Sequence, residues 1–272
     1  AKYNQEIRYI FKDRTPTADA AGDRLGLTDL TTIYRSVVRL YMQSIEGQEL
    51  LKRTAIESYS AILEGDMTGR GRQQDSAAAI KYSPTLYDFL ALRAISFFTA
   101  DETTGSLPAK RFVINQPWML GNTMQFTRNR MAIPSDTASP ASFALQIFRN
   151  LAMLHMEDTD RAALISIELK RLDFVRSSAV IPGKDSLYQL VLTNFETAEA
   201  ASPHASMISF ALARFLHERG QEYRPLASDR NKWDIKSALE VCERGMKNHP
   251  GSDGAKNCEL LKQSILKPEL KI

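Results

Sequence analysis

Residues 238–272 constrain the fold of this chain more than any other stretch. Their sequence, ALEVCERGMKNHPGSDGAKNCELLKQSILKPELKI, predicts a helix, a tight turn and a second helix. The pattern that follows Pro268 is typical of the start of a strand. The only two cysteines of the chain, Cys242 and Cys258, lie on either side of the turn. The stretch therefore predicts a helical hairpin that ends at the boundary of a second domain.

Helical periodicity dominates the rest of the chain. Apolar residues recur at helical spacing within residues 29–46, 56–63, 83–98, 139–156, 158–175, 184–200, 204–222, 235–248 and 254–266. Ser83-Pro84 and Ser139-Pro140 each supply a capping residue followed by a proline that suits the first helical position. Alternating strand patterns are absent before residue 268, so we predict an all-α fold of stacked helical hairpins.

The spacing of small and large residues in the last hairpins is typical of tetratricopeptide repeats. The first-helix positions are matched by Leu212, Leu216 and Gly220, and the second-helix positions by Ala238, Cys242, Gly245 and Pro250. Earlier helices do not keep the period of about 34 residues that a regular array requires. We therefore predict an irregular stack of hairpins that becomes tetratricopeptide-like towards the C-terminus. The alternative is an irregular bundle in which this match arises by chance.

These patterns predict one all-α domain over residues 1–266. Residues 66–82 are polar and contain glycine, and we expect an exposed loop there. Residues 99–138 contain Pro108, Pro117 and Pro134, which interrupt any long helix, and a short helix is expected only near residues 118–126. This insert is a candidate sub-boundary within the domain. Residues 267–272 are interpreted as the truncated start of a following β-domain.

The two cysteines leave two interpretations open. Each lies about eight residues from the middle of the turn, so at a rise of about 1.5 Å per residue they are level across an antiparallel hairpin. Cys242 and Cys258 are therefore a candidate disulfide, which would indicate an oxidising compartment. The alternative is a pair of buried thiols that behave as small apolar side chains.

Composition argues against two classes of partner. The net charge is +3, and the 25% of residues that are charged are interspersed in sign, whereas nucleic-acid binding usually needs a clustered basic face. No apolar run approaches the roughly 20 residues that span a bilayer. We therefore expect no nucleic-acid partner and no direct membrane insertion by this chain.

No motif for catalysis or metal binding stands out. The sequence lacks a His-Glu-x-x-His pair, a Gly-x-Ser-x-Gly elbow, a P-loop and a Cys-x-x-Cys, so we predict no catalytic residues, no cofactor and no metal. The four histidines are dispersed, and each is expected to be a surface or capping residue. Glu157, Asp158 and Asp160 are interpreted as favourable charge at a helix N-terminus.

Aromatic residues in the insert offer one candidate contact surface. Trp118 is the first candidate, because tryptophan is enriched among the residues that dominate protein interfaces. The alternative is that Trp118 packs on the body of the domain.

Three segments, taken in order, resemble one protein family. They are Thr54-Ala55-Ile56-Glu57-x-Tyr59, then Ser83-Pro84-Thr85-Leu86-Tyr87-Asp88-Phe89-Leu90-Ala91-x-Arg93-Ala94, then Gly254-Ala255-Lys256-Asn257-Cys258-x-x-Leu261 with Pro268-x-Leu270. Together they resemble the large α2-macroglobulin-like envelope proteins of Bacteroidetes. In that family a helical N-terminal region precedes a row of macroglobulin β-sandwich domains. The resemblance covers most of residues 30–272.

The resemblance implies a non-enzymatic helical scaffold or protein-interaction domain in a protease-inhibitor-type envelope protein. Its partners would be proteins or other domains of the same chain, and its location would be exported, periplasmic or envelope-associated. The reactive Cys-x-x-Gln of the family is not present, because Cys242 precedes Glu-Arg-Gly and Cys258 precedes Glu-Leu-Leu. The alternative function is a glycan-binding, tetratricopeptide-containing outer-membrane lipoprotein, which would need a platform of exposed aromatic residues.

Overall fold

The computed structural model describes residues 49, 51–53, 55, 80–99, 112–129, 139–226 and 228–267. All of them belong to the second of the two units of the chain, Glu49–Ile272. The helices predicted at residues 29–46 and 56–63 lie outside the described residues, as does the strand expected after Pro268. The extent of the predicted domain, 1–266, therefore stays a prediction.

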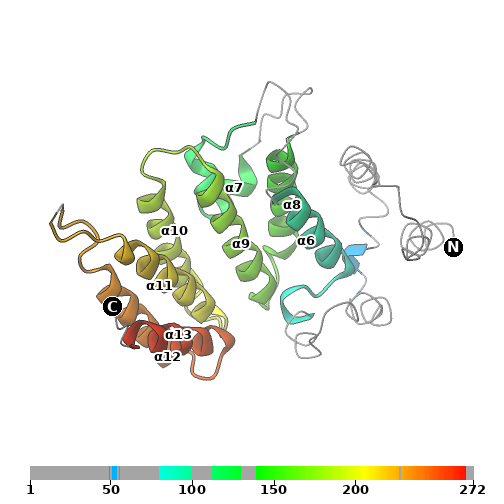
Figure 1. Ribbon diagram of the computed structural model, residues 1–272. Helices are drawn as coiled ribbons and strands as arrows, with labels where there is room; N and C mark the ends of the chain where they lie inside the picture. Colours follow the sequence, from blue (N-terminus) through cyan, green and yellow to red (C-terminus); the bar gives the residue numbers. More distant parts are fainter. Residues whose placement is uncertain are drawn as a thin grey trace, which may run out of the picture. The chain divides into compact units, whose positions relative to one another are not determined.

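The described part of the protein is all-α, as the sequence predicted (Figure 1). Its elements are α6 (Leu86–Thr99), η3 (Pro117–Leu120), α7 (Thr123–Arg128), α8 (Pro140–His155), α9 (Ala162–Ser178), α10 (Lys184–Ala198), α11 (Ala205–Gln221), α12 (Asp234–Asn248) and α13 (Asp253–Leu266). Among the residues that the structure describes, the only pairing of β type is an isolated bridge between Ala55 and Thr85.

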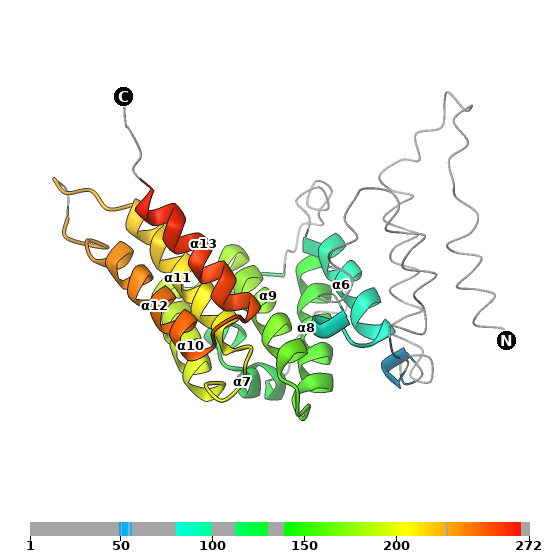
Figure 2. The same cartoon turned by 90° about the horizontal axis from the view of Figure 1, so that it is seen from below.

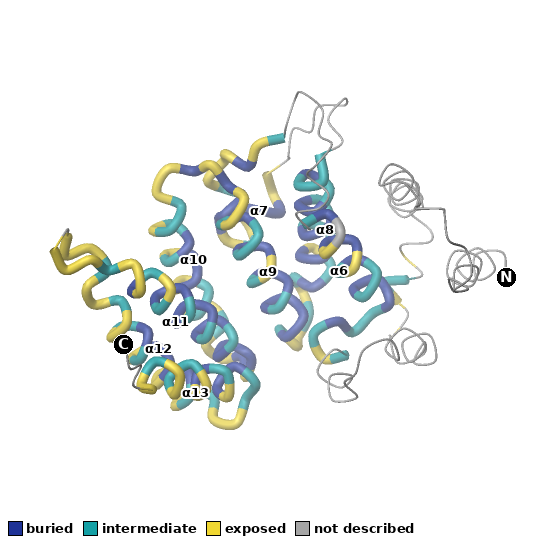
Figure 3. Tube along the Cα trace, in the orientation of Figure 1, coloured by how far each residue is buried: buried dark blue, intermediate teal, exposed yellow. Residues whose placement is uncertain are grey.

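The helices pack in nearly the order of the sequence (Figures 1 and 2). Helix α8 packs against α6 and α9, and α11 packs against α9, α10, α12 and α13. Buried residues lie where helices meet, whereas the outward faces and parts of the connections are exposed (Figure 3). Each inner helix thus contributes an apolar face to a continuous core, which is how stacked helices gain stability.

The two Ser-Pro pairs start their helices differently. Ser139 is the N-cap of α8 and Pro140 its first residue, as predicted. Helix α6 instead begins at Leu86, after Thr85, so the prediction for Ser83-Pro84 was two residues early. Thr85 and Asp88 explain the shift, because the Asp88 amide donates to Thr85 Oγ1 at 3.1 Å and the Thr85 amide donates to Asp88 Oδ2 at 2.8 Å.

The insert is fastened to the body by a buried arginine on α9. The Arg171 side chain is fully buried and donates to both carboxylate oxygens of Glu168, at 2.9 and 2.6 Å. It also donates to the carbonyls of Met119 and Gly121, at 2.6 and 2.8 Å, and its guanidinium lies 4.3 Å from the centre of the Phe126 ring. Arg171 thus satisfies the backbone where η3 meets α7 and fixes this irregular segment against α9.

Small residues allow α12 and α13 to approach α11 closely. A Cβ atom on Gly254 would lie 2.2 Å from the Ser206 carbonyl carbon, so the first turn of α13 rests directly on the α11 backbone. A Cβ atom on Gly245 would lie 2.8 Å from Ser209 Cβ. Ala238, at the start of the same face of α12, is fully buried. The absence of a side chain at Gly245 and Gly254 thus permits the close approach of α12 and α13 to α11.

Candidate functional site

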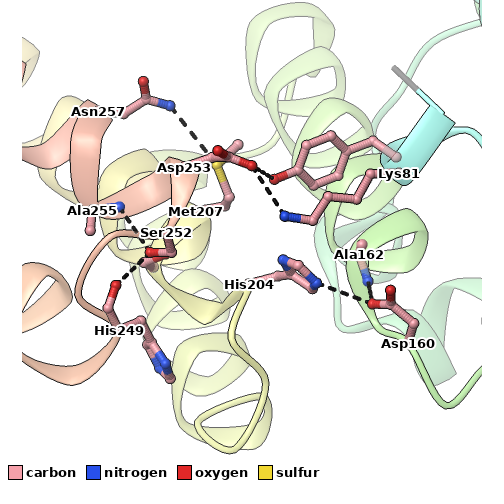
Figure 4. Close-up of polar contacts among 12 residues, drawn as sticks. Lys81, Asp160, Ala162, His204, Met207, His249, Ser252, Asp253, Ala255 and Asn257 are labelled. Atoms are coloured by element: carbon pink, nitrogen blue, oxygen red, sulfur yellow. Dashed lines mark hydrogen bonds and ion pairs between the residues drawn. The ribbon is translucent and has the colours of Figure 1, made fainter. Parts of the chain in front are cut away.

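A cluster of polar side chains joins four segments that are far apart in the sequence (Figure 4). We call it the polar latch and define it as Lys81, Tyr82, Asp160, His204 and Asp253. Lys81 and Tyr82 precede α6, Asp160 lies between α8 and α9, His204 is the N-cap of α11, and Asp253 opens α13. The latch therefore ties the chain before α6 to the C-terminal hairpin.

Asp253 receives two hydrogen bonds from across the domain. The Tyr82 hydroxyl donates to Asp253 Oδ2 at 2.7 Å, and Lys81 Nζ donates to the same oxygen at 3.2 Å. These two donors lower the pKa of the Asp253 carboxyl, while burial and the nearby Asp253 carboxylate raise the pKa of the Tyr82 hydroxyl. At neutral pH the contact therefore joins a neutral phenol and an ammonium group to a carboxylate.

His204 forms the second half of the latch. Its Nε2 lies 3.1 Å from Asp160 Oδ1, and that oxygen also accepts a hydrogen bond from the Ala162 amide at 2.9 Å. The His204 ring meets the Tyr82 ring edge-on, with their centres 6.1 Å apart. Burial and the positive charge of Lys81 lower the pKa of His204, so its imidazole is neutral at neutral pH. The predicted role of Asp160 as favourable charge at a helix N-terminus is confirmed by its bond to Ala162.

Two serines extend this network beneath α13. The Ser252 hydroxyl donates to the His249 carbonyl at 2.6 Å and accepts from the Ala255 amide at 3.3 Å, which caps the helix. Ser206 Oγ lies 2.8 Å from Ser252 Oγ and supplies the donor. Figure 4 shows that this capping network and the contact of Asp253 share the first turn of α13. The start of α13 is thus held from both sides.

The polar latch joins segments of the fold to one another, because its donors and acceptors are paired among themselves. The Tyr82 and Lys81 donors both end on one oxygen of Asp253, and His204 ends on Asp160. Nowhere in the described residues do three or more His, Cys, Asp or Glu side chains gather in a way that could hold a metal ion. The geometry therefore supports a structural role for these groups.

A separate polar contact centres on the buried His155, at the end of α8. Its Nε2 lies 2.7 Å from Asp88 Oδ1 of α6 and its Nδ1 lies 2.6 Å from Asp158 Oδ2. The His155 side chain is only 3% exposed, so the expectation that each histidine is a surface or capping residue was wrong here. Burial opposes the charged form, yet the two carboxylates outweigh it and raise the pKa of His155.

The two cysteines meet across the C-terminal hairpin. Cys242 of α12 and Cys258 of α13 are both fully buried free thiols, and Cys258 Sγ lies against α12, 3.3 Å from the place that a Cβ atom on Gly245 would take. The interaction with Cys258 lowers the pKa of the Cys242 thiol, whereas Cys242 and burial together raise the pKa of the Cys258 thiol. This contact is consistent with the expectation that the two residues lie at the same height on the two antiparallel helices. Whether they oxidise to a disulfide stays a prediction.

The two tryptophans lie in different environments. Trp118, the candidate contact residue, is half-buried in η3, and its ring centre lies 6.5 Å from that of Phe126. Trp233, at the end of the connection between α11 and α12, is 65% exposed. Leu226 in the same connection is fully exposed. Residues 222–233 thus expose two large apolar side chains in one short connection.

Sequence reasoning missed the latch because its members come from segments far apart in the chain, and two of them, Lys81 and Tyr82, lie in a segment expected to be a loop. Residues 66–82 were expected to be an exposed loop, but residues 80–82 are helical and Tyr82 is half-buried against Asp253. Lys81 and Asp253 are 172 residues apart in sequence, and no local pattern pairs them. His155 could have been found, because it follows Leu151 by four residues on the apolar face of α8.

The described residues define the class as an all-α helical protein in which the polar latch joins distant segments. No protein-family model matches the sequence, no curated protein matches it significantly, and no solved structure matches it significantly. A search of the described helices for one long and apolar enough to cross a membrane finds none.

Proposed function

We propose that this chain is a non-enzymatic helical scaffold that binds a protein surface through the connection between α11 and α12. The observation that carries the proposal is the exposure of Trp233 and Leu226 in residues 222–233. Burying the surface of a large apolar side chain is favourable compared with leaving it in water. Tryptophan also contributes much of the binding energy of many protein interfaces. Two such residues in one short connection favour a contact surface.

Charge on the connection supports a protein as the partner. Arg224, Arg230 and Lys232 are exposed there, and Lys232 Nζ lies 5.6 Å from the centre of the Trp233 ring. Arginine and tryptophan are the residue types most enriched at the centre of protein interfaces. The partner surface would offer an apolar pocket for Trp233 with carboxylates around it. Tetratricopeptide-like stacking of α11, α12 and α13, supported by the close approach at Gly245 and Gly254, would hold the connection rigidly at its two ends.

The resemblance to α2-macroglobulin-like envelope proteins suggests which protein surface this is. We propose another domain of the same polypeptide, with the helical region positioning the domains that trap a protease, in the periplasm or at the cell envelope. The reading frame after Ile272 tests this part. Consecutive β-sandwich sequences followed by a Cys-x-x-Gln support it, and a stop codon directly after Ile272 overturns it.

The contact surface is tested by fluorescence quenching of Trp233. Trp118→Phe leaves Trp233 as the only tryptophan of the chain. Iodide should quench this variant strongly in the 272-residue chain and several-fold less in the longer protein or with a bound partner domain. Equal quenching in both states overturns the contact surface. The complementary variant Trp233→Phe reports Trp118 alone and should show no such difference, because Trp118 already packs against Phe126.

One observation keeps glycan binding as the second candidate. Exposed aromatic rings stack on sugars, and Trp233 presents such a ring. A platform normally needs more than one ring, and Trp118 is half-buried elsewhere in the fold. Glycan-array binding that disappears in Trp233→Ala would favour this function over the protein scaffold. Absence of array binding by the unaltered protein, together with protection of Trp233 in the longer protein, would exclude it.

A further inference from the structure

We propose that Cys242 and Cys258 form a structural disulfide that closes before α13 docks and is then shielded from reductants. The inference rests on the geometry of the C-terminal hairpin and not on the proposed function. It assigns a covalent modification to the two residues and an order to its formation.

The hairpin places the sulfur of Cys258 against the part of α12 that carries Cys242. Both cysteines are fully buried where α12 packs against α13, and each thiol shifts the pKa of the other. Cys258 Sγ would also lie 3.3 Å from a Cβ atom placed on Gly245, which stands three residues after Cys242 on the same face of α12. The absence of a side chain at Gly245 thus leaves room for the sulfur of Cys258 beside Cys242. Adjacent side chains on facing helices are what a disulfide requires.

Burial determines when the bond can form. Both cysteines are fully buried in the docked hairpin. An external disulfide must reach a sulfur atom in line with the bond that it breaks, so it cannot react while α13 is docked. Docking is held by the contact of Gly254 with the α11 backbone and by the bond from Tyr82 to Asp253. Oxidation therefore belongs to the open hairpin, during folding or during transient release of α13.

The reaction with oxidised glutathione is balanced. The thiolate of one cysteine attacks oxidised glutathione, forms a mixed disulfide and releases one glutathione thiolate. The second cysteine loses its proton, attacks the protein sulfur of the mixed disulfide and releases the second glutathione thiolate. The protein loses two protons and two electrons, and one oxidised glutathione becomes two reduced molecules. The short turn between α12 and α13 favours the second step, because it keeps the second thiol close to the first even when α13 is released.

Refolding experiments test both the bond and its timing. The reduced protein is unfolded in denaturant and refolded in a glutathione redox buffer, while a second sample stays folded in the same buffer. Peptide mapping without reductant should find Cys242 joined to Cys258 in the refolded sample. The folded sample should form the same bond at least about tenfold more slowly, because only the open hairpin reacts. Two free thiols after refolding, stable glutathione adducts or disulfide-linked dimers overturn the bond. Equal rates in the two samples overturn the order of events.

Variants separate the bond from general effects on folding. Tyr82→Phe removes the hydroxyl that holds Asp253 and should accelerate oxidation of the folded protein several-fold without changing the product. Tyr223→Phe, in the exposed connection after α11, is the matched control and should not change the rate. The oxidised protein should melt about 5–10 °C above the reduced protein. The double variant Cys242→Ala with Cys258→Ala should show no effect of reductant on its melting temperature, and a reductant effect that persists there overturns the assignment.

Discussion

The buried contact between Asp88, His155 and Asp158 predicts a stability that decreases as the pH rises. Both ring nitrogens of His155 face carboxylate oxygens, at 2.7 and 2.6 Å, and only the protonated imidazole donates from both nitrogens. The folded protein therefore holds a proton on His155, which lies in the last turn of α8, where the helix dipole also favours a cation. Loss of that proton leaves Asp88, which is fully buried, without its cationic partner.

The direction of the pH effect follows from linkage. The pKa of His155 in the folded protein is raised above the ordinary value of 6.5. Its contribution to the free energy of unfolding is complete below about pH 6.5 and is lost as the pH rises through the folded pKa. Replacing His155 with glutamine keeps a donor but never a charge. We expect this change to cost about 3 kcal/mol near pH 6, because a buried charged pair loses one partner while Asp88 retains its bonds from Thr85.

Urea unfolding of the unaltered protein and His155→Gln, at about pH 6 and about pH 9, measures this effect. The free energy of unfolding of the unaltered protein should decrease between the two pH values, whereas that of the variant should change little. The difference in stability between the two proteins should therefore become smaller as the pH rises. At the lower pH the variant should melt about 6–12 °C below the unaltered protein. His217→Gln is the control, because His217 is half-exposed and contacts only Gln221 among the hydrogen bonds described. An equal pH slope in His155→Gln and the unaltered protein would refute the buried imidazolium.

Three further changes follow from the same structure. Tyr82→Phe should lower the free energy of unfolding by about 1 kcal/mol, seen as faster amide exchange in the first turn of α13, since Asp253 is partly exposed. Arg171→Met should cost about 3–5 kcal/mol by urea unfolding, whereas adding Glu168→Leu should recover part of the loss, because no unpaired charge is left buried. Gly254→Ala should destabilise the protein in thermal melts although alanine is the better helix former, because its methyl group would overlap the α11 backbone. A Gly254→Ala variant as stable as the original would contradict this packing.

The sequence predicts the helices well because their apolar faces repeat at helical spacing. The predicted segments 184–200 and 204–222 differ from α10 and α11 by no more than two residues at either end. The start of α6 was less accurate, since Thr85 competes with Ser83 for the capping position and only its bond with Asp88 decides between them. Local chemistry of this kind can be inferred from sequence once both partners of a capping box are considered.

Long-range polar contacts could not be predicted in the same way. Arg171 looks like a surface residue in sequence, because nothing local shows that η3 and α7 bring their carbonyls to it. The same holds for Tyr82 and Asp253, which are 171 residues apart. Periodicity describes which face of a helix is apolar, but it does not identify the partner of a charged group on another segment. The candidate contact residue Trp118 was proposed from residue type alone, and exposure distinguishes it from Trp233.

The distribution of these contacts bears on function. Arg171 holds the insert, His155 joins α6 to α8, and the polar latch secures the segment before α6 and the start of α13. The connection between α11 and α12 differs, because the hydrogen bonds described for residues 222–233 join groups at most four residues apart, such as Lys232 to Asp229. A connection without long-range ties keeps Trp233 in solvent, whereas a tie like that of Arg171 would cover it. The long-range polar contacts therefore lie outside residues 222–233, and the surface of this connection remains available to a partner.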